Sequence, residues 1–178
     1  MDWIAAAILG LGIYVQWTRW QQRRSAARGT PCPEAAAKTH QEEVAEAIAA
    51  NDLERMQRLL PQTTDPLLQH ALMTRMVYIA HKGRKDENMR RLLKTVARTY
   101  VANFDGIGLQ LQTQEQEIKD KAPIFKWLAI VLEEEEAYEE LLTLCRTALD
   151  WKLEDGTKTG YRGRIQRIQK KMQRADAG

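Results

Sequence analysis

Few residues in this chain have the types and spacing that catalysis or metal binding requires. The three histidines are scattered, and His40 with Glu42 and Glu43 is the nearest approach to a ligand cluster. This group lies on the polar side of its predicted helix, which favours a solvated histidine over a metal ligand. The sequence has no glycine-rich phosphate loop, no HExxH motif and no GxSxG motif. It therefore predicts a protein that is not an enzyme and that needs no cofactor or metal.

Charged residues gather in two places in the last third of the sequence. The first is an acidic block, Glu133–Glu136 with Glu139 and Glu140. A structural role is favoured over a binding site for a basic peptide, because the later glutamates complement the dipole of the helix that they begin. The second is a C-terminal helix whose cations are expected to lie opposite its apolar stripe: Arg162, Arg164, Arg167, Lys170, Lys171 and Arg174. We consider three roles for this helix, in decreasing order of preference: a solvated cap of the domain, contact with anionic lipid, and binding of nucleic acid.

The two cysteines, Cys32 and Cys145, have no CxxC spacing, so neither a disulfide framework nor a zinc site is indicated. Cys145 falls in an apolar helical stripe and is expected to be a small core residue. Cys32 is expected to be an idle thiol, with acylation as the alternative.

The elements that would position these residues begin with a long apolar run, which predicts a transmembrane helix. Residues 3–18 carry no charge, and a helix over residues 1–20 would be roughly 30 Å long, about the thickness of the hydrocarbon core of a bilayer. Trp3 stands at one end and Trp17 with Trp20 at the other, where interfacial aromatic belts lie. With the basic flank of Arg23 and Arg24, residues 1–24 are predicted to form a membrane anchor.

Positive charge predicts the orientation of this anchor. Arg19, Arg23, Arg24 and Arg28 follow the apolar run, and only Asp2 and the terminal amine precede it. The positive-inside tendency then places the N-terminus outside and the rest of the chain in the cytoplasm. One alternative is a cleaved signal peptide, which normally has its basic residues before the apolar stretch. The other is a buried core helix, for which apolar runs of this kind are also used.

Residues 25–33 read as a linker, and the pattern after it is helical throughout. Helix signals predict elements over residues 33–50, 52–60, 66–82, 86–104, 123–132, 138–153 and 161–174. Residues 105–108 are expected to end the fourth of these, and residues 109–121 are compatible with a helix or a strand. Since no run of alternating β-branched residues predicts a sheet, we expect an all-α domain over residues 34–178.

The segment 123–171 resembles a tetratricopeptide-type helical hairpin. Its first helix has the large–small pattern of such repeats at Phe125, Leu128, Ala129 and Leu132, and its second has it at Tyr138, Leu141, Cys145 and Ala148. The ending is similar to the tail that closes such repeats in uncharacterised bacterial proteins: Glu154-Asp155-Gly156-Thr157-Lys158, Gly160-Tyr161, Gly163-Arg164-Ile165 and Arg167. Leu141 stands where a small residue is usual, the expected proline after the second helix is absent, and no 34-residue period extends upstream.

What the resemblance implies is a small α-solenoid, in which helical hairpins cover their apolar faces by stacking and leave a concave surface. We expect a single-pass membrane protein that acts as an adaptor or assembly factor for a protein partner at the cytoplasmic membrane face. Lys126 and Glu139 are the candidate partner contacts. The alternative is a membrane-proximal nucleic-acid-binding protein that uses Arg164, Arg167, Lys170 and Lys171.

Overall fold

The helices begin and end largely where local signals place them. The structure is a computed structural model, which describes residues 39–114 and 118–176. Over these residues it contains eight α-helices, one short 3₁₀ helix and no strand, which confirms the all-α prediction for this part of the chain. The elements are α2 (His40–Ala50), α3 (Leu53–Leu59), η1 (Leu60–Gln62), α4 (Pro66–Lys82), α5 (Glu87–Ala102), α6 (Phe104–Gln114), α7 (Pro123–Glu134), α8 (Tyr138–Asp150) and α9 (Gly160–Asp176).

Aspartate caps set the starts of three helices. The Asp65 carboxylate accepts hydrogen bonds from two backbone N–H groups in the first turn of α4, and Pro66 occupies the first helical position. Asp52 and Asp86 cap α3 and α5 in the same way. Because a side-chain oxygen satisfies N–H groups that have no intrahelical partner, these starts could be predicted from the sequence. Gly83 ends α4, as expected.

The first described helix starts later than Pro33, where the sequence suggested a start. Thr39 is the N-cap of α2, with an extended backbone (φ −66°, ψ 150°). Its hydroxyl accepts from the Glu42 N–H, and the Glu42 carboxylate accepts from the Thr39 N–H. This reciprocal capping box begins the helix at His40, so the single helix predicted over residues 33–50 does not run through Thr39. Pro33 itself lies outside the described residues.

The break expected over residues 105–108 is instead the first half of a helix. α5 ends at Ala102, and Phe104 begins α6 rather than extending the stripe of α5. Residues 109–114, which were compatible with a strand, are helical as well. The reason is tertiary packing. Gly108 lies so close to the Trp151 ring that an added Cβ would be 2.8 Å from its nearest atom, so this glycine serves a close approach and does not break the helix.

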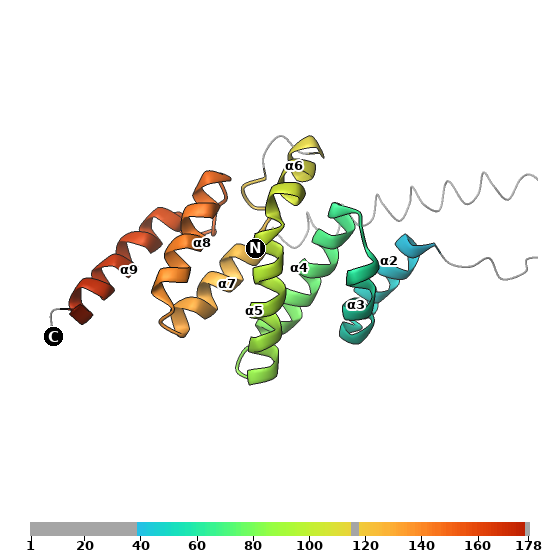
Figure 1. Cartoon of the computed structure of the whole chain (residues 1–178), viewed down its shortest axis with the longest axis horizontal. Coiled ribbons are helices and arrows are strands. Elements are labelled where there is room, and N and C mark those ends of the chain that lie inside the picture. The colour runs from blue at the N-terminus through green and yellow to red at the C-terminus, as the bar shows by residue number, and fades with distance from the viewer. Residues whose placement is uncertain (1–38, 115–117, 177–178) are drawn as a thin grey trace, which may run out of the picture. The chain divides into compact units, whose positions relative to one another are not determined.

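The helices stack as successive antiparallel pairs (Figure 1). α3 packs on α2, α5 on α4, and α8 on α7. The first helix of each later pair also contacts both helices of the preceding pair: α4 contacts α2 and α3, and α7 contacts α4 and α5. α9 packs on α8 at the opposite end of the stack from α2 (Figure 1).

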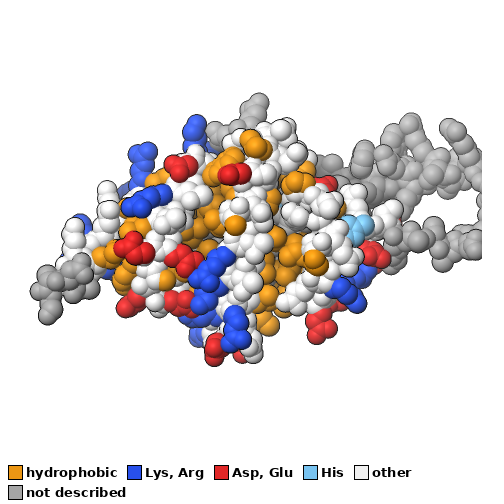
Figure 2. All heavy atoms as spheres, in the orientation of Figure 1, with side chains coloured by type: hydrophobic (Ala, Val, Ile, Leu, Met, Phe, Trp, Pro, Cys, Tyr) orange, Lys and Arg blue, Asp and Glu red, His pale blue; other side chains and the backbone are white. Residues whose placement is uncertain are grey.

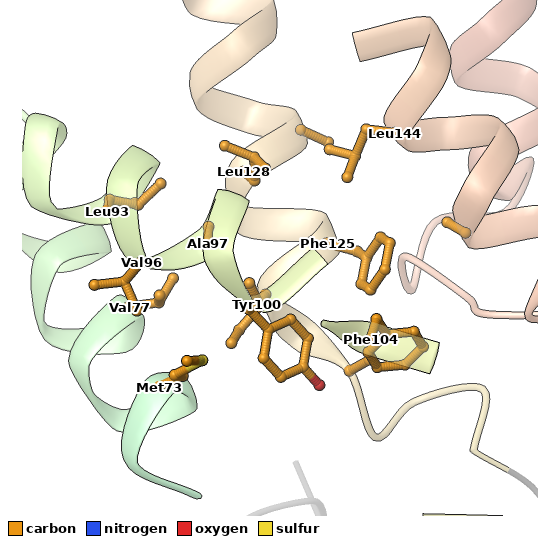
Figure 3. Packing of buried hydrophobic residues seen from close by; sticks show 14 of the residues in the cluster. Met73, Val77, Leu93, Val96, Ala97, Tyr100, Phe104, Phe125, Leu128 and Leu144 are labelled. Carbon is orange, nitrogen blue, oxygen red and sulfur yellow. The ribbon is translucent and has the colours of Figure 1, made fainter. Parts of the chain in front are cut away.

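The centre of the core is a group of aromatic rings from successive helices (Figure 3). Tyr100 of α5, Phe104 of α6 and Phe125 of α7 are all buried. The Phe104 ring centroid lies 5.3 Å from that of Tyr100, 4.9 Å from that of Phe125 and 5.2 Å from that of Trp151, the residue that follows α8. Aromatic pairs in these tilted and edge-on arrangements add to the free energy of burial, so this group holds together three helices and the residue that follows α8.

Among the described helices, none is both long enough and apolar enough to cross a lipid bilayer. The predicted anchor, with Trp3, Trp17, Trp20, Arg23 and Arg24, lies outside the described residues, as does the linker over residues 25–33.

Candidate protein-binding surface

A half-buried aromatic group lies where α4 meets α7. Tyr78 and His81 come from the last two turns of α4, and Trp127 comes from the second turn of α7. The Trp127 ring centroid is 5.8 Å from that of Tyr78 and 5.9 Å from that of His81, with the His81 ring nearly parallel to it at 22°. None of the three side chains is fully buried, so the rings present apolar and polar edges at the surface of the domain.

Cations surround these rings. The Lys82 ammonium lies 4.5 Å from the Tyr78 ring centroid, and the Arg75 guanidinium carbon lies 5.3 Å from it. A hydrogen bond with Lys82 lowers the pKa of the Tyr78 hydroxyl, and the charges of Lys82 and Arg75 add to this effect. We refer to Thr74, Arg75, Tyr78, His81, Lys82, Lys126 and Trp127 together as the α4–α7 surface.

Three polar atoms on one side of α4 are buried without a hydrogen bond. They are Thr74 Oγ1, Arg75 Nε and His81 Nδ1, none of which has a partner among the described residues. Thr74, Tyr78 and His81 are spaced i, i+4 and i+7, so the helix places them on one face. Buried polar atoms are almost always hydrogen-bonded. All three atoms are shielded from solvent, so a ligand at this place would contact the exposed parts of the side chains, such as the Trp127 and Tyr78 rings and the Lys82 ammonium, and not these atoms.

The electrostatic environment of His81 favours its neutral form. Burial is the largest cause of its lowered pKa, and the positive charges of Arg84 and Lys126 lower the pKa further, while Glu134 acts in the opposite direction. The positive field that opposes protonation of the imidazole would attract an anionic group to the same place.

The two predicted partner contacts lie in different places. Lys126 is half-buried in the first turn of α7 and is counted in the α4–α7 surface because it precedes Trp127 and its charge is felt at His81. A Cβ added at Gly156, in the segment between α8 and α9, would lie 3.5 Å from the Lys126 Nζ. Glu139 is exposed in the first turn of α8. Because α7 and α8 form an antiparallel hairpin, their first turns lie at opposite ends of the pair, and the structure does not bring Lys126 and Glu139 together.

The predicted basic face of the C-terminal helix is wrong at Arg164. This residue is only 6 % exposed, because it follows Tyr161 by three positions and precedes Ile168 by four, which places it on the buried stripe of α9. Its Nη1 donates to Glu133 Oε2 at 2.6 Å and its Nη2 to Asp155 Oδ2 at 3.4 Å. Lys171 also pairs with Glu133, at 3.2 Å. Arg167 and Lys170 are exposed, as expected.

The acidic block forms bridges between helices. Glu133 pairs with α9, while Glu134 and Glu135 accept from Arg84, Arg90 and Lys94 at or near α5. The glutamates thus have ion-pair partners on other helices, which the argument from the helix dipole did not predict. Since these carboxylates are already paired, fewer of them are available to a basic peptide.

Arg98 and Glu140 form a two-bond ion pair at 2.7 Å between α5 and α8. Basic and acidic side chains meet over this junction (Figure 2). The pair lies at the rim of a shallow apolar groove of about 200 Å³, lined by Val101, Leu128 and Leu144 among others. The Arg98 guanidinium and the Glu140 carboxylate already neutralise each other, so this groove offers a ligand fewer unpaired polar groups than the α4–α7 surface does.

Two smaller predictions can be compared with the structure. Cys145 is fully buried, as expected, and burial raises its pKa to about 11, so the thiol is inert. His40 is not simply solvated: its Nε2 lies 2.9 Å from Thr63 Oγ1 in a half-buried contact between α2 and the segment after η1. Within the described residues, no group of three or more histidine, cysteine or acidic side chains is arranged to hold a metal ion.

Sequence reasoning missed the aromatic members of the surface. A usable signal was present at Trp127, which lies off the core stripe of its helix formed by Phe125, Leu128 and Leu132. A large aromatic residue that the core stripe does not require is a candidate for surface contact. Comparison of the whole chain with models of known protein families, with curated proteins and with solved structures gives no match.

Proposed function

We propose that this protein is a membrane-tethered adaptor whose helical-repeat domain binds a protein partner through the α4–α7 surface. The observation that carries the proposal is the coincidence of the half-buried rings of Tyr78, His81 and Trp127 with the cations Arg75 and Lys82, which lie against the Tyr78 ring.

The packing order supports a short solenoid of tetratricopeptide-like hairpins. In a stacked repeat array, each helix pair buries its apolar face against its neighbours. The contacts of α7 with both α4 and α5, and of α4 with both α2 and α3, are of this kind. α9 would then close the last hairpin, α7–α8. Such arrays serve mainly as binding surfaces, which agrees with a role as an adaptor or assembly factor.

The chemistry of the α4–α7 surface supports a protein partner. Tryptophan, tyrosine and arginine dominate the binding energy of protein interfaces, because they combine a large apolar area with a polar group. A partner segment that places an apolar side chain against Trp127 could offer carbonyl or carboxylate oxygens to Arg75 and Lys82. Lys82 and Lys126 would favour a segment with negative charge.

The membrane tether in this proposal is the predicted anchor over residues 1–24, with the domain on the cytoplasmic side. Confinement to a membrane raises the effective concentration of a membrane partner, so a surface of modest affinity would be sufficient.

The proposal is tested by photo-cross-linking of the full chain in its own cells. A photoreactive amino acid at Thr74 should give one discrete adduct with another protein, and the same amino acid at the exposed Leu109, away from the surface, should not. Lys82→Glu should reduce the Thr74 adduct at least tenfold. The matched control is Lys85→Glu, which makes the same charge change at an exposed position three residues later and should leave the adduct intact. Equal adducts from both probe positions, or equal effects of both lysine variants, would refute the α4–α7 surface as the binding site.

A further inference from the structure

The exposed face of α9 carries only cations and amides. Five basic residues of α9 are exposed, with three exposed glutamines between them: Arg162, Arg167, Lys170, Lys171 and Arg174, and Gln166, Gln169 and Gln173. From Thr157 to Arg174 the sequence contains no aspartate or glutamate. Over residues 157–174, the helix therefore contains no counter-charge of its own; its last residue is Asp176.

Several other cations of the domain pair with carboxylates. Arg164 and Lys171 of α9 itself pair with Glu133, and the cations of α5 pair with the acidic block. By contrast, Arg162, Lys170 and Arg174 have no carboxylate within ion-pairing distance in the described part of the chain. Arg167 donates only to the Thr159 hydroxyl, at 3.3 Å. The structure thus divides the basic residues of α9 into two that pair with carboxylates, the buried Arg164 and the exposed Lys171, and an outer set of four without such a pair in the described residues: Arg162, Arg167, Lys170 and Arg174.

The outer set is arranged to meet a flat surface. At about 1.5 Å per residue, Arg162 and Arg174 are roughly 18 Å apart along the helix axis. At about 100° per residue, the four cations lie within one half of the helix circumference, opposite the stripe that contains Tyr161 and Ile168. α9 is the end helix of the described stack (Figure 1), so no following helix covers this face in the structure described.

We propose that the outer face of α9 binds the anionic headgroups of a lipid membrane. A row of cations on a straight helix matches a plane of negative charge, and each such cation strengthens adsorption to an anionic leaflet roughly fivefold. A lipid surface is favoured over nucleic acid, because the exposed face lacks an aromatic side chain on which bases could stack: Tyr161 is buried. The inference needs neither the protein partner nor the α4–α7 surface.

The test uses the full chain reconstituted with vesicles and a fluorophore that responds to the lipid interface. The fluorophore is attached through Gln173→Cys in a chain that also carries Cys32→Ser. Cys145 can remain, because it is fully buried. Vesicles of phosphatidylcholine alone are compared with vesicles that also contain phosphatidylglycerol, so that any contribution of the predicted anchor is present in both.

The expected result is a blue shift of the emission in the anionic vesicles only, reversed by high salt. The triple variant Arg162→Gln, Lys170→Gln, Arg174→Gln should lower the ratio of docked to free α9 about a hundredfold, the product of three roughly fivefold effects. The matched control Arg58→Gln, Lys85→Gln, Arg91→Gln removes the same charge from exposed positions on other elements and should leave the shift unchanged.

Three outcomes would overturn the proposal: an equal shift in neutral vesicles, an equal loss in the control variant, or displacement of α9 from the vesicles by RNA at concentrations below that of the lipid. Lys82→Glu, which tests the α4–α7 surface, should not change the shift. Failure of the lipid contact and failure of the protein contact can therefore be told apart.

Discussion

Replacing Arg164 by alanine tests whether this residue is a buried cation that stabilises the fold or a solvated cation at the surface. The guanidinium contacts Glu133 and Asp155, and the Asp155 side chain is fully shielded from solvent. Burial by itself raises the pKa of the Asp155 carboxyl, but hydrogen bonds from Thr157 and the charge of Arg164 outweigh burial and hold that pKa below its usual value. Loss of Arg164 would remove one of the groups that keep a buried carboxylate ionised.

The expected loss in the free energy of unfolding depends on which contacts Glu133 and Asp155 keep when Arg164 is removed. Breaking a buried ion pair by removing one partner costs about 3–5 kcal/mol. Glu133 is one-quarter exposed and keeps Lys171, and Asp155 keeps two hydrogen bonds from Thr157. We therefore expect the lower end of that range, about 3 kcal/mol, for Arg164→Ala. Arg167→Ala, at an exposed position on the same helix, should change the free energy of unfolding by less than about 0.5 kcal/mol.

The assay is urea unfolding of the full chain in mild detergent, followed by circular dichroism and by tryptophan fluorescence. Arg164→Met, which retains apolar volume without the charge, distinguishes lost packing from lost charge: it should remain nearly as destabilised as the alanine variant. The reasoning would be refuted if Arg164→Ala were no more destabilising than Arg167→Ala, because Arg164 would then behave as the solvated cation that the sequence predicted.

Three further predictions concern stability in the same assay. Burial lowers the pKa of His70 from 6.5 to about 4, so below pH 6.5 the unfolded chain takes up a proton that the folded chain does not. Stability should fall by roughly 3 kcal/mol between pH 6.5 and 4 from this residue alone, and unfolding curves of His70→Gln across that range should lack this component. Gly108→Ala drives a methyl group into the Trp151 ring and should cost about 1–3 kcal/mol. Gly106→Ala in the same helix meets nothing within 4 Å and should stabilise by up to about 1 kcal/mol; equal signs for the two would contradict the helix over residues 104–114. Thr39→Ala removes the cap of α2 and should lower the free energy of unfolding by about 1 kcal/mol. Thr113→Ala, at an exposed position, is the control.

The parts of the fold that the sequence predicted well are those with local causes. The bounds of α4 follow from Asp65, Pro66 and Gly83, which act within one turn of the helix ends. α6 could not be predicted in this way, because two glycines argue against a helix. Its stability comes from the contacts of Phe104 with rings of α5, α7 and the residue after α8, and such contacts between distant segments leave no local pattern.

The candidate site shows the same division. Lys126 was selected from the sequence and adjoins Trp127, but His81, at which its charge is felt, comes from a helix more than forty residues earlier. Arg164 was misplaced because charge argued for exposure while helical spacing argued for burial. Only the positions of Glu133 and Asp155 resolve that conflict, since they supply the counter-charge that makes burial tolerable.

The position of Arg164 in the sequence has a consequence for the order in which its contacts can form. Glu133 and Asp155 leave the ribosome before Arg164, so until α9 is synthesised these two carboxylates lack this shared cation. Docking of α9, the last described helix, therefore brings in the cation and also buries Tyr161 and Ile168 in one step. We expect a chain shortened ahead of α9 to expose apolar surface of α8 and to be less stable than the full chain.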